Sequence, residues 1–104
     1  MAYRIIYHPK AEAELDKLHA DIAIEAGARI ADDYVDEIIT FIEALDTFPE
    51  RGTVRKSVIP GLRIIGYRRS VSVAFCVRDD EVFILGVFAR GRDINDEILQ
   101  ERNQ

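Results

Sequence analysis

Five arginines lie at the ends of apolar, strand-like runs in the second half of the chain: Arg63, Arg68, Arg69, Arg90 and Arg92. A guanidinium group keeps its charge at any physiological pH and donates two parallel hydrogen bonds to a carboxylate or a phosphate. Such residues could be catalytic cations, anchors for a macromolecular partner, or solvated strand ends. Gly91, in the stretch GVFARGRD, leaves room for a partner backbone. This spacing favours a binding role for the set.

Other chemistries have weaker support in the sequence. The two histidines, His8 and His19, fall on different predicted elements, and no Cys or His cluster has metal-ligand spacing. The serines have no histidine nearby in sequence, although a contact in space stays open. The glycines form no phosphate-binding loop. We therefore predict no metal site, no cofactor and no catalytic residue, and the arginines remain the candidates.

Length and charge limit the function further. A chain of 104 residues, 48% hydrophobic and 32% charged, predicts one globular domain over residues 1–104. The net charge of −5 argues against nucleic acid as the main partner, because such proteins usually carry a basic surplus. The charge is unevenly distributed, however. Residues 54–93 hold eight basic and four acidic residues, whereas the remainder holds six basic and fifteen acidic ones.

The sequence predicts a cytoplasmic location for the protein. Cys76 is the only cysteine, so no intrachain disulfide can form, and its apolar neighbours indicate a buried residue. No window approaches the roughly 18 apolar residues of a membrane span, and the N-terminus lacks the apolar stretch of a signal peptide.

The first half of the chain predicts a strand and two helices. A β-branched and aromatic run at 3–8 ends at Pro9, which is typical of the first helical turn. A first helix then extends to Gly27, and a second extends from about Ala28 to Thr47. Because almost nothing separates them, they should form an antiparallel hairpin. The apolar stripes that face the core are Ala11, Leu15, Leu18 and Ile22 in the first helix, and Ile30, Tyr34, Ile38, Phe41 and Leu45 in the second.

The second half predicts strands. Runs at 62–68, 71–77 and 82–89 are separated by turns short enough for an antiparallel meander, and 54–58 has room for one short strand. The run at 82–89 is apolar on both faces, as in a central strand. The tail from Ile94 onward is either a short polar helix or a frayed end. The order β-α-α-β-β-β predicts a two-layer α+β domain with the helical hairpin packed on a mainly antiparallel sheet.

Four stretches resemble, in order and spacing, the ParE toxins of the RelE/ParE superfamily, which belong to type II toxin–antitoxin (plasmid stabilisation) modules. The stretches are HPKAEAELDKL, GARIADDYVDEIITFIEALDTFPERGTV, PGLRIIGYRRSVSVAFCV and VFILGVFARGRD. The resemblance covers about residues 3–93 and implies the β-α-α-β-β-β fold. It leaves function open, because this scaffold hosts two activities.

ParE-like members inhibit DNA gyrase without nuclease activity, whereas RelE-like members are ribosome-dependent mRNA endonucleases. An endonuclease needs groups that remove and donate protons, and the RelE branch typically has a Tyr or His near the C-terminus. This chain has neither after Tyr67. We therefore expect a non-enzymatic gyrase inhibitor, with a RelE-like endonuclease using Arg63, Arg68 and Arg90 on phosphate as the alternative. A non-toxic homologue that only serves its antitoxin complex is a third possibility.

The resemblance also implies partners and contact residues. A ParD-like antitoxin should wrap an extended, partly helical segment over the hairpin and the sheet, forming a hetero-oligomer; no membrane and no sequence-specific nucleic acid contact is expected. For the target, we expect contacts through Arg63, Arg68, Arg90, Arg92 and Asp93. For the antitoxin, we expect contacts through Leu15, Leu18, Tyr34, Arg69 and Arg78.

Overall fold

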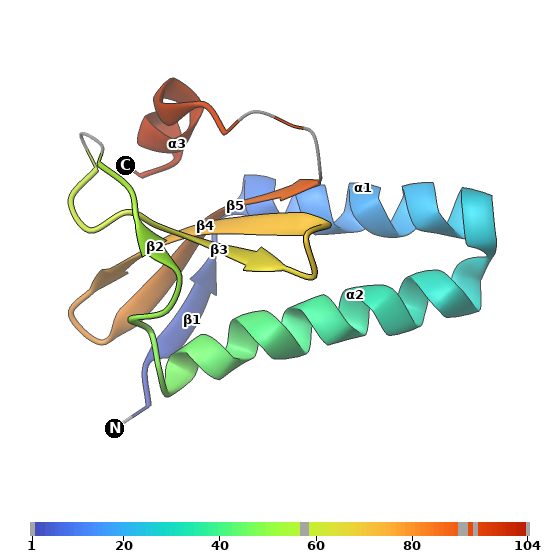
Figure 1. The fold of residues 1–104 in the computed structure, drawn as a ribbon, viewed down its shortest axis with the longest axis horizontal. Helices are drawn as coiled ribbons and strands as arrows, with labels where there is room; N and C mark the ends of the chain where they lie inside the picture. Colours follow the sequence, from blue (N-terminus) through green and yellow to red (C-terminus); the bar gives the residue numbers. More distant parts are fainter. Residues whose placement is uncertain (1, 57–58, 90–91, 93, 104) are drawn as a thin grey trace.

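The computed structural model describes residues 2–56, 59–89, 92 and 94–103. The elements along the chain are β1 (Arg4–Tyr7), α1 (Pro9–Ala26), α2 (Ala28–Glu43), a 3₁₀ turn η1 (Ala44–Asp46), β2 (Thr53–Val54), β3 (Arg63–Tyr67), β4 (Val71–Arg78), β5 (Glu81–Ala89) and α3 (Asp96–Arg102). Figure 1 shows the two long helices running side by side along one side of the sheet. The predicted α+β class and element order are confirmed.

Local signals explain the helical hairpin. The His8 ring caps α1 because its Nδ1 accepts a hydrogen bond from the Lys10 amide at 3.0 Å, and Pro9 occupies the first turn, as predicted. Gly27 alone separates the helices, with φ +97° and ψ 158°. Only glycine adopts this combination readily, so Gly27 allows the immediate reversal. The second helix ends at Glu43 and tightens into η1, whereas we predicted one helix to Thr47.

The sheet has five strands in the order β1-β5-β4-β3-β2, with β1 parallel to β5 and every other pair antiparallel. The meander of β3, β4 and β5 is confirmed, and β5 is central because it pairs with both β1 and β4. The short strand in this region is β2, Thr53–Val54, which overlaps the predicted range 54–58 only at Val54. Residues 57 and 58 lie outside the described part of the chain.

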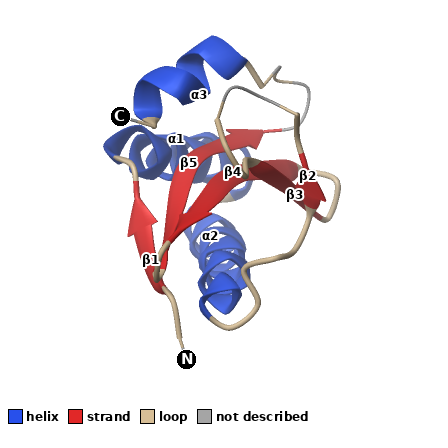
Figure 2. Ribbon diagram, turned by 90° about the vertical axis from the view of Figure 1, so that its left-hand side faces the viewer, coloured by secondary structure: helices blue, strands red, loops and turns tan. Residues whose placement is uncertain are grey.

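Both faces of the sheet are covered (Figure 2). The hairpin packs on one face, and the buried side chains there include Leu15, Ile38 and Phe75. The tail forms α3, which packs on the other face through Leu99, whose side chain is fully buried. Cys76 is buried on this second face, as predicted. The tail is therefore part of the packed fold, which its polar composition did not indicate.

The tip of the hairpin extends beyond the sheet (Figure 1). Ile30, predicted to face the core, is 55% exposed, and Ile24 is 84% exposed. Neither residue has a strand beneath it to pack against, so the helical periodicity alone overestimated the extent of the core.

We predict that Gly27→Ala lowers the free energy of unfolding by about 1–3 kcal/mol, because a Cβ there forces a disfavoured backbone conformation. An added Cβ would meet no atom within 4 Å, so the loss measures backbone strain alone. The measurement is urea denaturation. Gly66→Ala in β3 is the control, since Gly66 has no positive φ and open space, and it should cost nothing. Equal losses in both variants would contradict this explanation.

Candidate functional site at the arginine rim

One end of the sheet gathers the predicted arginines. Tyr67, Val71 and Ala89 lie in register on β3, β4 and β5, so the turn after β3 and the segment after β5 leave the sheet at the same rim. We call residues 67–70 the arginine turn, since it carries Arg68 and Arg69. Both side chains are exposed. Arg90 and Asp93 lie outside the described residues, and their predicted roles stay predictions.

The arginine turn has an unfavourable backbone. Arg68 has φ 49° and Arg69 has φ 58°, and the Ser70 amide donates to the Tyr67 carbonyl at 3.0 Å. A turn with two successive left-handed residues is normally built from Asn and Gly, because a Cβ is strained there. Each arginine therefore costs about 1 kcal/mol or more relative to the usual residues. Two long cationic side chains occupy the positions where the fold itself prefers small ones.

Helix α2 holds this strained turn in place. The Tyr34 hydroxyl and the Ser70 hydroxyl are 2.5 Å apart, and the Tyr67 hydroxyl donates to Glu37 at 2.9 Å. The Tyr67 ring also packs against Phe41, with centroids 5.0 Å apart. Partial burial and the hydrogen bond to Glu37 raise the pKa of the Tyr67 phenol, so this hydroxyl stays protonated near neutral pH. These contacts position the arginines, and the Glu37 carboxylate is the acceptor of the Tyr67 hydrogen bond.

The arginines of the turn are available for a partner. Arg68 lies 3.5 Å from Glu37 in an ion pair with side chains 70% and 50% exposed, and it stacks on Tyr67. Such exposed pairs contribute little stability and can exchange partners. Arg69 makes no ion pair with any described residue.

The structure separates the remaining predicted residues. Arg92 is exposed and lines a pocket of about 200 Å³ with Leu18 of α1, next to the end of β5. Arg63 begins β3, about 16 Å along the strand from the arginine turn. Arg78 ends β4 at the opposite end of the sheet, with its guanidinium 4.2 Å from the Phe83 ring centroid. Leu15 is only 7% exposed and packs in the core. Among the described target candidates, Arg63 therefore lies away from Arg68.

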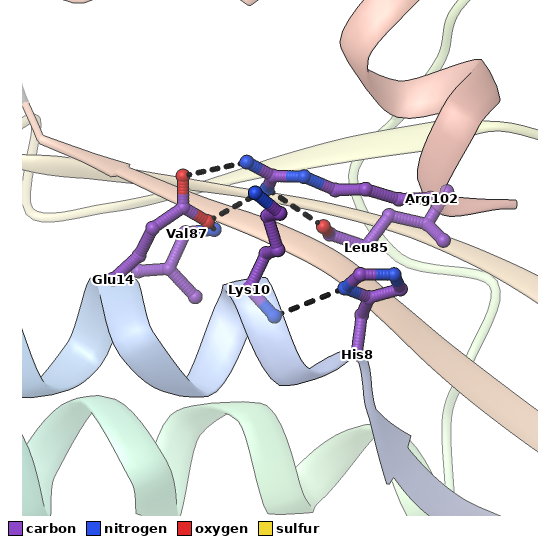
Figure 3. Close-up of polar contacts among 6 residues, drawn as sticks. All are labelled: His8, Lys10, Glu14, Leu85, Val87 and Arg102. Carbon is purple, nitrogen blue, oxygen red and sulfur yellow. Dashed lines mark hydrogen bonds and ion pairs between the residues drawn. The ribbon is translucent and has the colours of Figure 1, made fainter.

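An ion pair that the sequence reasoning missed fixes the end of β5 (Figure 3). The ladder shifts register between Ala74 and Phe75, so that Leu85 is an extra residue in β5. Strand β1 ends at Tyr7, opposite Ile84, and leaves the edge of β5 without a strand neighbour beyond that point. Arg102 donates to the Leu85 carbonyl at 3.0 Å, and Glu14 accepts from the Val87 amide at 3.0 Å.

Glu14 and Arg102 also bind each other, through contacts of 2.8 and 3.3 Å between their paired oxygens and nitrogens. Their side chains are only 17% and 10% exposed. Gly86 makes the approach possible, since a Cβ there would lie 2.9 Å from Arg102 and 2.5 Å from the Phe88 ring. The pair joins α1, β5 and α3 near the end of β5. No local pattern could have indicated it, because the partners are 88 residues apart.

His8 is the histidine with a perturbed pKa, and its role is structural. Burial and the nearby charges of Arg102 and Lys10 lower its pKa, although Glu14 opposes the effect. Its Nδ1 is occupied by the cap of α1 (Figure 3). No group of three or more His, Cys, Asp and Glu residues within the described chain has the arrangement of a metal site.

Comparison with known proteins decides the family. A family model described as the ParE toxin of the type II toxin–antitoxin system parDE matches residues 5–94. The chain belongs to the ParE toxin family. Among curated proteins, no sequence matches the chain. No helix of the described residues is both long and apolar enough to cross a membrane.

Solved structures agree with this assignment. A chain of the chromosomal ParDE system from Pseudomonas aeruginosa is 26% identical, with a TM-score of 0.74 over 86% of this chain and 97% of that one. Two more distant structures share the fold. Free Escherichia coli toxin RelE, in a variant form, is 18% identical (TM-score 0.65; 99% and 96% covered), and the RelBE2 toxin–antitoxin complex from Mycobacterium tuberculosis is 19% identical (TM-score 0.65; 86% and 100% covered).

We predict that Arg102→Leu lowers the free energy of unfolding by about 3 kcal/mol, because it leaves the buried Glu14 carboxylate unpaired. The double variant Glu14→Gln/Arg102→Leu should recover part of that loss, since the glutamine oxygen still accepts from Val87. Urea denaturation provides the measurement. Arg4→Ala, which breaks an exposed pair with Glu81, should cost less than about 1 kcal/mol. Equal losses of unfolding free energy in Arg102→Leu and Arg4→Ala would contradict this interpretation.

The lowered pKa of His8 predicts a pH dependence. Below about pH 6.5 the unfolded chain binds a proton at His8 more readily than the folded chain. Stability should therefore fall as pH decreases from that value through the lower folded pKa, and then level off for this group. Urea midpoints measured across this range test the effect. His8→Asn keeps a capping side chain without the titration and should remove this component of the slope; an unchanged slope would exclude His8 as its source.

Proposed function

We propose that this ParE-family chain is the toxin of a type II toxin–antitoxin module and inhibits DNA gyrase by binding it. The observation that carries the proposal is the arginine turn, where Arg68 and Arg69 hold strained left-handed positions and are exposed at the rim of the sheet. Backbone strain persists at positions where it serves a function. The exposed pair of Arg68 with Glu37 and its stacking on Tyr67 stabilise the fold little, so we attribute the two arginines to contact with another molecule.

A binding role agrees with the chemistry of this rim better than catalysis does. Cleavage of RNA by its own 2′-hydroxyl requires a group that accepts a proton near neutral pH. Near the two arginines, the hydroxyls of Tyr34, Tyr67 and Ser70 are engaged in hydrogen bonds, and the pKa of Tyr67 is raised. The Glu37 carboxylate already accepts from Tyr67 and pairs with Arg68. Exposed arginine side chains, with their parallel N–H donors, are suited to binding carboxylates or phosphates. The net charge of −5 also makes a protein surface a less repulsive target than ribosomal RNA.

We further propose that a ParD-like antitoxin neutralises the chain by covering the same rim. The P. aeruginosa relative comes from a ParDE system, and the M. tuberculosis structure is a toxin–antitoxin complex. Arg68, predicted for the target, and Arg69, predicted for the antitoxin, are adjacent in one turn. Tyr34, also predicted for the antitoxin, contacts the same turn through Ser70. An antitoxin bound here would exclude the target by direct overlap, and an acidic segment would match the charge.

The test replaces the strained arginines with the residues that the turn prefers. Arg68→Asn/Arg69→Gly should raise the free energy of unfolding by about 1 kcal/mol or more, because it relieves the strain. The same variant should lose inhibition of DNA supercoiling by purified gyrase. A variant that gains stability but loses inhibition shows that the two arginines serve the interaction with gyrase and not the fold.

The matched control removes two charges elsewhere. Arg4→Gln/Arg78→Gln alters two exposed arginines at the opposite end of the sheet and should still inhibit gyrase. The proposal is wrong if the wild-type chain leaves supercoiling intact, or if the turn variant inhibits as strongly as the wild type.

A further inference from the structure

A groove of about 370 Å³ lies between the N-terminal half of α1, the C-terminal half of α2 and the end of β1. Its floor is apolar and consists of Leu15, Val35 and Ile39. The first two are nearly buried and the third is half-buried. The groove is on a different face of α2 from Tyr34, Glu37 and Phe41, which hold the arginine turn. It is therefore separate from the site described above.

Carboxylates surround this apolar floor. Glu12 and Asp16 come from successive turns of α1, and Glu43 comes from the end of α2. All three are exposed, and none of them forms an ion pair with another described residue. Like charges four residues apart on a helix destabilise it. The three carboxylates at the rim of the groove therefore have no compensating positive charge among the described residues. Elsewhere on α1, the opposite charges of Lys17 and Asp21 pair at 3.0 Å.

A polar atom without a partner lies in the same groove. The hydroxyl oxygen of Tyr7 is buried and makes no hydrogen bond with any described residue. Burial, followed by the charges of Glu43 and Glu12, raises the pKa of Tyr7 to about 12. Two of the carboxylates are therefore close enough to act on the phenol.

We propose that this groove binds a lysine or arginine side chain carried by a segment of a protein partner. The methylene stem of such a side chain would lie on the floor of Leu15, Val35 and Ile39, as long basic side chains do on apolar surfaces. The charged head would reach the carboxylate rim of Glu12, Asp16 and Glu43. The apolar floor matches the methylene stem of a lysine or arginine, and the acidic edges match its charged head.

The charge complementarity specifies the partner. A hydrated metal ion would gain nothing from an apolar floor, and an acidic segment would be repelled by the rim. The groove has the opposite sign from the arginine turn. A partner that contacts both surfaces therefore needs a basic anchor for the groove in addition to acidic residues for the turn.

The experiment uses the intact chain and a blocked peptide, acetyl-Leu-Arg-Leu-amide, as the probe. Amide chemical shifts are followed by NMR as the peptide is added. We expect saturable shifts at Glu12, Asp16, Ile39 and Glu43, and none with the matched peptide in which neutral citrulline replaces arginine. In Glu12→Gln/Glu43→Gln, affinity for the arginine peptide should fall by about fivefold or more. The same variant should unfold at a higher urea concentration than the wild type, since it removes repulsion.

The control variant Glu25→Gln/Asp33→Asn removes two exposed carboxylates that lie outside the groove, and its affinity should match that of the wild type. Equal shifts with the citrulline peptide, shifts confined to other surfaces, or no saturable binding would overturn the proposal. Sedimentation measures the oligomeric state and so tests whether the groove binds a second copy of this chain. If the chain self-associates and Glu12→Gln/Glu43→Gln abolishes this, the groove binds a second copy, and the assignment to a partner protein is wrong.

Discussion

The ion pair between Glu14 and Arg102 connects helix α1, strand β5 and helix α3. Strand β5 lies inside the sheet between β1 and β4, but its second half loses the neighbouring strand β1 after Ile84. The extra residue Leu85 also displaces the ladder with β4. Two backbone groups, the Leu85 carbonyl and the Val87 amide, would then be unsatisfied at a nearly buried edge, which is costly. Arg102 and Glu14 satisfy both groups and neutralise each other (Figure 3).

This arrangement explains why a short polar tail is part of the fold. The helix α3 is only seven residues long and could not be stable alone. Leu99 and Arg102 attach it to the sheet, while the Asn95 side chain caps its first turn at 2.8 Å from the Glu97 amide. The same contacts constrain β5 just before the chain reaches Arg90 and Arg92. The end of β5 is thus held by an interaction between Glu14 and Arg102, which lie near opposite ends of the sequence.

Most of the fold was predictable because its signals are local. Pro9 and Gly27 mark the ends of α1, the apolar periodicity identifies both helices, and the alternation from Val71 to Val77 identifies β4. The candidate site was predictable only in part. Leu15 lies in the core, as its place in the apolar stripe of the first helix predicted. The sequence also indicated which residues are cationic, but not that Arg63 and Arg78 lie away from the turn. Those facts depend on strand register and on packing between distant segments, as does the Glu14–Arg102 pair, and no spacing rule contains them.

The central claim is that the arginine turn of this protein binds another macromolecule and that the protein cleaves no covalent bond. The most direct measurement adds the purified chain to ribosomes that are translating a defined message and maps the message by primer extension. The account predicts full-length message at every toxin concentration that inhibits gyrase. Cuts at defined codon positions would contradict it and assign the arginines to RNA cleavage.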